Sequence, residues 1–157
     1  DILMATHRVP EDYLFKAQLA RYQDKTIEAD RYLKQFFTLV ENPLYGPMYN
    51  THKIKAWIIS DPEKALALAE KEINNRATPE TYHLLALAQL ATNQKELALT
   101  TIENFVNGKI SEPMALLHSA LVYKANGQQE KVVDLKIALT TSAFELGPIV
   151  AAQIADL

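Results

Sequence analysis

The chain matches itself at a spacing of 34 residues, and this internal period restricts the possible folds more than any other feature of the sequence. In that alignment Pro79 faces Pro113, and Asn93 faces Gly127. Asparagine and glycine both accept the left-handed backbone conformation that ends many helices. Further identities lie in the same frame: Ala86 with Ala120, Leu87 with Leu121, Ala91 with Ala125, Gln94 with Gln128, and Glu96 with Glu130. The period therefore predicts a helix–turn–helix unit that is repeated along the chain.

Seven prolines divide the chain into segments of helical length. Proline is accepted in the first turn of a helix and disfavoured in its interior, so each proline is read as a boundary. No stretch alternates polar and apolar residues long enough to make a strand, and the predicted fold class is all-α. The predicted organisation is a tail at 1–9, helix pairs at 10–40, 48–75, 79–108 and 113–141, and a terminal helix at 148–157.

Composition agrees with a helical domain and excludes several classes of function. The 157 residues include 21 alanines and 21 leucines against 4 glycines, a bias towards helix-forming residues. The formal net charge of −3 argues against a nucleic-acid-binding protein, because such proteins usually carry a basic surplus. No apolar run reaches the roughly 18 residues that a bilayer requires, so no membrane insertion is expected. The absence of cysteine excludes disulfides and thiolate metal sites.

The residues of the repeat agree with a known family pattern, in which an aromatic, a small residue, a turn, an alanine and a second aromatic follow one another. The third pair supplies Tyr82, Ala86, Asn93, Ala98, Ile102 and Phe105 in that order. The fourth supplies Leu116, Ala120, Tyr123, Gly127, Val132 and Leu139, and the first supplies Tyr13, Ala17, Asp24, Ala29 and Leu33. With its 34-residue helix–turn–helix period, the chain resembles a tetratricopeptide repeat (TPR) protein of the bacterial type.

The second pair departs from this pattern. Ala56 lies only nine residues before Ala65, whereas twelve residues separate Ala86 from Ala98. The turn inside the second pair is therefore predicted to be shorter than the others.

The resemblance implies a right-handed α-solenoid of antiparallel helix pairs, with the last helix covering the end of the stack. In such proteins the first helices line a concave face that binds a peptide or helix of a partner protein. The matching positions here are His83, Leu87, Leu90, Leu117, Leu121 and Lys124. These residues form either a docking strip or a surface that neighbouring helices cover, and both readings stay open.

Nothing in the sequence predicts catalysis, a cofactor or a metal. The four histidines are His7, His52, His83 and His118, and the last two are 35 residues apart, one more than the repeat. That extra residue turns His118 about 100° around its helix relative to His83, which argues against a shared metal site, and we expect histidines that lie at the surface or are partly buried. No Gly-rich phosphate loop, Gly-x-Ser-x-Gly motif or His-Glu-x-x-His motif is present.

The leading hypothesis is a non-enzymatic scaffold that binds a protein partner. A self-association module that forms homo-oligomers, and an accessory domain of a larger enzyme or secretion or assembly protein, are the alternatives. The loop from Asn42 to Tyr49 either packs over the first two pairs or supplies a binding edge. The lack of cysteine and the start at Asp1 favour a processed or trimmed product, exported rather than cytoplasmic.

Overall fold

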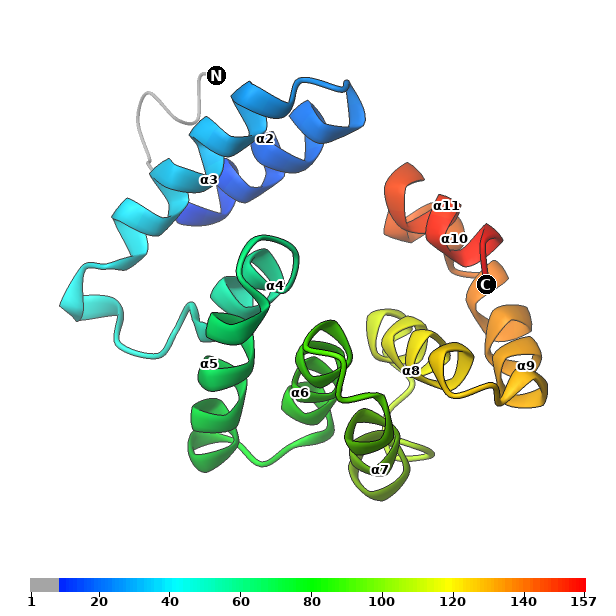
Figure 1. The fold of residues 1–157 in the computed structure, drawn as a ribbon. Helices are drawn as coiled ribbons and strands as arrows, with labels where there is room; N and C mark the ends of the chain where they lie inside the picture. Colours follow the sequence, from blue (N-terminus) through cyan, green and yellow to red (C-terminus); the bar gives the residue numbers. More distant parts are fainter. Residues whose placement is uncertain (1–8) are drawn as a thin grey trace. The chain divides into compact units, whose positions relative to one another are not determined.

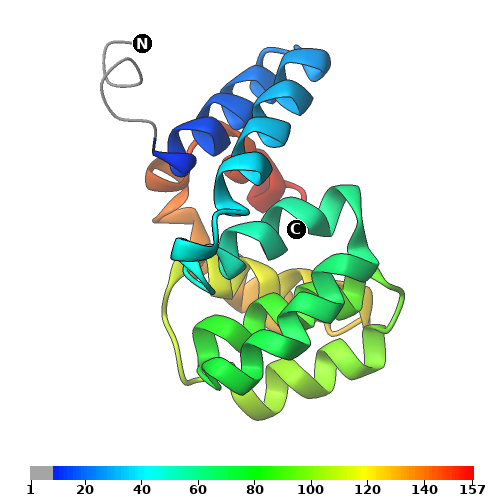
Figure 2. The ribbon, with the colours of Figure 1, turned by 90° about the vertical axis from the view of Figure 1, so that its left-hand side faces the viewer.

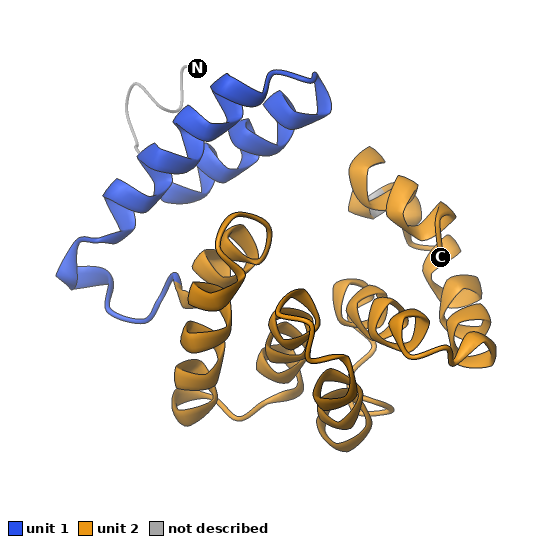
Figure 3. Cartoon of the chain, viewed as in Figure 1, with its two compact units in different colours: residues 1–49 blue, residues 50–157 orange. Residues whose placement is uncertain are grey.

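A computed structural model describes residues 9–157, and the described part of the chain consists of helices joined by turns, without a strand (Figure 1). The predicted all-α class is thus confirmed. The chain divides into two compact units, residues 1–49 and residues 50–157 (Figure 3). Most of the predicted tail, and His7 with it, lies outside the described residues.

The first unit is one pair of packed helices followed by a loop that folds back on it. Helix α2 (Pro10–Tyr22) packs along α3 (Thr26–Val40), and the short 3-10 helix η1 (Pro43–Tyr45) follows. The loop ends at Tyr49, whose ring packs edge-on against Phe36 at a centroid distance of 6.2 Å. The Tyr49 hydroxyl also donates a hydrogen bond of 3.1 Å to the Glu11 carboxylate. Burial and this carboxylate raise the pKa of Tyr49 to about 12.

The same loop also exposes apolar side chains. Leu44 and Met48 lie mainly in solvent, whereas Tyr45 packs edge-on against Tyr49 at 5.0 Å. Part of the predicted loop therefore covers the first pair, and part of it stays accessible.

The second unit is a succession of helices, most of which pack against the next helix in the chain (Figures 1 and 2). In chain order they are α4 (Asn50–Ser60), α5 (Pro62–Asn75), α6 (Pro79–Ala91), α7 (Lys95–Phe105), α8 (Pro113–Ala125), α9 (Gln129–Thr140), α10 (Ala143–Leu146) and α11 (Pro148–Ala155). Helix α6 also packs against both α4 and α8. These three helices, each the first of its pair, form a row that we call the first-helix row.

Proline marks the beginning of most helices. Helices α2, α5, α6, α8 and α11 and the 3-10 helix each begin at a proline. The fixed backbone angle of proline suits the first helical position, and the N–H that proline lacks would have had no partner there. The side chains of Asp61 and Glu112 then cap α5 and α8, accepting hydrogen bonds from the backbone N–H groups of Lys64 and Ala115.

Three of the turns between paired helices share one geometry. Asp24, Asn93 and Gly127 all have positive φ, at 58°, 62° and 71°. In each turn the following N–H donates to a carbonyl five residues earlier, as from Gln94 to Gln89 at 2.8 Å, which is the Schellman closure of a helix. The prediction for Asn93 and Gly127 is confirmed. So is the shorter turn of the second pair, where Asp61 alone separates α4 from α5.

Three apolar clusters form the interior of the second unit, and each is continuous across neighbouring helices. Ala65, Ala69 and Ala88 are buried in the first, and Ala86 and Ala98 are buried in the second, where small side chains let helices approach closely. At the junction of α6 and α7 the rings of Tyr82 and Phe105 stack at a centroid distance of 4.1 Å.

The last cluster closes the unit at its C-terminal end. Leu117 and Ala120 of α8 are buried together with Leu139 of α9 and Ile154 of α11. Val150 and Leu157 pack against the same group. The final segment therefore covers apolar side chains of the fourth pair.

Candidate functional site

The six candidate partner-binding residues come from α6 and α8 and form three pairs spaced by one repeat. His83 corresponds to Leu117, Leu87 to Leu121, and Leu90 to Lys124. Burial follows the same spacing: the first pair is buried, and the second pair is partly buried. The third pair differs in exposure between the two helices, because Leu90 is partly buried and Lys124 is exposed.

His83 and Leu117 lie in the interior and present almost no surface to a partner. They are 4% and 1% exposed, respectively. At these two positions the side chains pack inside the unit and do not form an outer surface. The expectation of a surface or partly buried histidine is wrong for His83 and also for His118, which is 5% exposed.

The remaining four candidates keep accessible surface. Leu90 packs against the cluster around Ala86, and Leu121 packs against the cluster that contains Ile154 of α11. Lys124 donates a hydrogen bond from Nζ to the backbone carbonyl of Asp156. The C-terminal segment therefore lies next to Leu121 and Lys124, the two accessible candidates on α8.

The two buried histidines form a direct pair. The Nδ1 atoms of His83 and His118 are 2.8 Å apart, and the ring centroids are 4.8 Å apart with planes tilted by 48°. Burial lowers the pKa of His83 to about 4, and burial also holds the pKa of His118 well below its ordinary value.

The spacing of the two histidines in the sequence is what lets them meet. Two residues exactly one repeat apart point the same way on their helices, so they cannot face each other across adjacent helices. The 35-residue spacing turns His118 by about 100° relative to that common direction, and this rotation lets it meet His83.

A second polar group is buried between α4 and α5. Glu72 is fully buried and its carboxylate accepts hydrogen bonds from Asn50 at 2.6 Å, from Asn75 at 3.1 Å and from the Arg76 guanidinium at 2.7 and 3.0 Å. Burial alone would raise the pKa of Glu72, but these hydrogen bonds and the Arg76 charge outweigh it and hold the pKa below its usual value. The group joins the end of α5 to the beginning of α4, and the Glu72 carboxylate at its centre has no accessible surface for a ligand.

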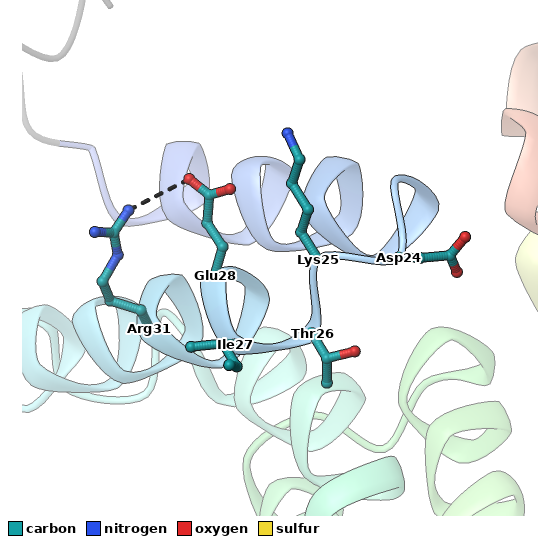
Figure 4. A pocket seen from close by; sticks show the side chains of 6 residues that line it. All are labelled: Asp24, Lys25, Thr26, Ile27, Glu28 and Arg31. Atoms are coloured by element: carbon teal, nitrogen blue, oxygen red, sulfur yellow. Dashed lines mark hydrogen bonds and ion pairs between the residues drawn. The ribbon is translucent and has the colours of Figure 1, made fainter.

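The pocket drawn in Figure 4 lies at the turn between α2 and α3 and is lined by six residues: Asp24, Lys25, Thr26, Ile27, Glu28 and Arg31. Arg31 donates to Glu28 at 3.4 Å, so opposite charges are already paired inside it. Ile27 is 90% exposed, and the other lining side chains are exposed except for the partly buried Glu28. The pocket is a surface hollow without a buried polar group aimed into it.

The described residues assign neither a metal site nor a membrane span, and similarity to known proteins assigns no family. Across residues 9–157, no group of three or more histidine, aspartate or glutamate side chains is arranged to hold a metal ion. None of the helices in this range is both long and apolar enough to cross a membrane. No family model, curated protein or solved structure matches the chain.

Proposed function

We propose that the chain is a non-enzymatic, TPR-like interaction module that binds a peptide or helix of a partner protein along its first-helix row. The single observation that carries the proposal is that Leu87 and Leu121 recur at one phase on consecutive helices of that row and keep accessible surface. Leu90 extends the apolar surface on α6, and Lys124 adds a positive charge on α8.

The shared turn geometry supports the repeat on which this proposal depends. Asp24, Asn93 and Gly127 hold the same backbone conformation at corresponding positions of three pairs. A repeated unit places the same side-chain position at regular intervals, and an extended partner segment can contact several of these positions at once. Buried apolar anchors carry most of the energy of such interfaces.

Two charge-introducing variants and a matched control test the proposal. Leu87→Lys and Leu121→Lys place a charge on the first-helix row, whereas Leu97→Lys places it on α7, where the leucine is 47% exposed. Proteins captured from a cell extract by the tagged chain are identified by mass spectrometry for each variant. We expect the same partners with the wild type and with Leu97→Lys, and their loss with Leu87→Lys and Leu121→Lys at unchanged far-ultraviolet circular dichroism.

Two results would count against this function. If both row variants unfold, Leu87 and Leu121 belong to the core, and neighbouring helices rather than a partner cover them. Unchanged capture by folded row variants would move binding elsewhere, first to the loop from Asn42 to Tyr49, where Leu44 and Met48 are exposed.

Self-association is the second candidate function, and one observation favours it. Large apolar side chains of the first unit are exposed, including Phe15 at 68% and Ile27 at 90%. Light scattering over a range of concentrations separates the two functions: a mass that stays at 17.7 kDa excludes a homo-oligomer, and a concentration-dependent dimer supports one.

A further inference from the structure

The contact between α6 and α8 contains a buried pair of ionisable side chains that the proposed function does not use. His83 of α6 and His118 of α8 approach through their Nδ1 atoms at 2.8 Å. Among the described residues, no other side-chain hydrogen bond joins these two helices. The two helices also share an apolar cluster, in which Ala86 of α6 is buried together with Val122 and Tyr123 of α8.

A nitrogen–nitrogen distance of 2.8 Å requires one proton between the two rings, and no more. One imidazole donates from Nδ1–H, and the other accepts at an Nδ1 that carries no proton and holds its hydrogen on Nε2. A first added proton goes to Nε2 of the donor ring and leaves the hydrogen bond intact. A second added proton goes to Nδ1 of the acceptor ring, and the contact then consists of two N–H donors and two positive charges facing each other.

The surroundings make even the first protonation unfavourable. Both imidazoles are nearly without solvent contact, and burial penalises the charged form of each ring. Glu112 at the start of α8 and Glu80 of α6 favour a charge on His83, whereas Lys55 of α4 opposes a charge on either ring. From α5, α7 and α9, which also pack against α6 or α8, no charged group of the described residues acts on the pair.

We propose that the His83–His118 pair is a pH-sensitive contact, which holds α6 against α8 near neutral pH and releases it in mild acid. When the helices separate, both imidazoles reach water and recover an ordinary pKa of about 6.5. The separated state therefore binds more protons than the packed state below that pH, and the packed state loses stability as the pH falls from about 6.5 towards 4.

Release would change the accessible strip as well as stability. Leu87 lies one helical turn beyond His83 on the same side of α6, and Leu121 holds the same position after Leu117 on α8. Separation of the two helices would move these leucines apart and expose the apolar side chains beneath them. The proposal stands independently of whether the strip binds a partner.

The size of the expected effect follows from the two proton affinities. For His83, with a pKa of about 4 when packed and about 6.5 when solvated, the unfolding equilibrium constant rises about 30-fold between pH 7.5 and pH 5.0. If His118 also stays neutral in the packed state, the combined rise is about 1,000-fold.

Nuclear magnetic resonance of the full chain gives the first test, because histidine ring nitrogen shifts report which nitrogen carries the proton. At pH 7 we expect one ring of the pair to carry its proton on Nδ1 and the other on Nε2. We also expect neither ring to become imidazolium above about pH 5 while the chain is folded. Titration of both rings near pH 6.5 in the folded chain would overturn the proposal.

Urea unfolding at pH 7.5 and pH 5.0 gives the second test. It is followed by fluorescence of Trp57, the single tryptophan, which packs against the cluster between α4, α5 and α6. The double variant His83→Gln/His118→Gln removes both titrating rings, and the wild type is the comparison. We expect the double variant to lose at least 30-fold of the wild-type pH dependence. Equal pH dependence in the two proteins would overturn the proposal, and the nuclear magnetic resonance result decides the matter if the double variant does not fold.

Discussion

Removal of the Glu72 carboxylate should strongly destabilise the second unit. The carboxylate is fully buried and is the common acceptor for Asn50, Asn75 and Arg76. Glu72→Ala leaves the amide of Asn50, itself only 8% exposed, without its acceptor. A hydrogen bond to a charged group contributes about 1.5–3 kcal/mol when buried.

The contribution of Arg76 to that loss is smaller. Its side chain is 55% exposed, so water replaces much of what the carboxylate supplied. Adding the buried Asn50 bond to a discounted contribution from Arg76 gives an expected loss of about 3 kcal/mol for Glu72→Ala. Glu72→Gln keeps the shape and one acceptor oxygen, and we expect a loss of about 1 kcal/mol.

Urea unfolding followed by Trp57 fluorescence and by circular dichroism measures these losses. Glu70→Ala is the matched control, because Glu70 lies on the same helix and is exposed, and its substitution should change stability by less than about 0.5 kcal/mol. The folded pKa of Glu72 lies below its ordinary value, so its stabilising effect is present above about pH 4.5 and is lost as the pH falls towards the folded pKa. A loss for Glu72→Ala no larger than that of the Glu70 control would refute the reasoning.

Three further changes test the packing of the repeat. Replacing Ala86 or Ala120, both fully buried, with leucine should overpack the helix contacts and cost about 1–3 kcal/mol, measured as a lower urea midpoint; unchanged midpoints for both would show that the repeat phase is wrong. Deleting residues 148–157 should expose the cluster around Leu117 and promote aggregation, seen by light scattering; a truncated chain that stays monomeric with an unchanged midpoint would contradict the covering role. Gly127→Ala should cost about 1 kcal/mol, because φ is 71° there, and thermal melting without a lower midpoint would argue against the strained turn.

The helical architecture could be predicted because its signals are local. Proline at a helix start, and a residue that tolerates positive φ at a helix end, act on their own backbone, so Pro79, Asn93 and Gly127 could be interpreted one by one. The short turn at Asp61 followed from counting residues between alanines.

The polar interior could not be predicted in the same way. Glu72 is buried only because Asn50, 22 residues earlier, and Arg76 meet it in space, and nothing local marks it out from exposed glutamates such as Glu70. His83 and His118 likewise depend on how α6 and α8 are rotated against each other. Periodicity fixes which residues share a face of one helix, but it does not fix which face the next helix covers. For that reason the candidate strip included both accessible leucines and the buried Leu117.

Methyl nuclear magnetic resonance of the leucines in the presence of a captured partner tests the binding account most directly. The partner is added to the folded chain, and shift changes of assigned methyl groups locate the contact. The account predicts that the largest changes fall on Leu87 and Leu121, with small ones on Leu97 of α7. Changes confined to Leu44 in the loop or to Leu19 of α2, with the two row leucines unaffected, would contradict it.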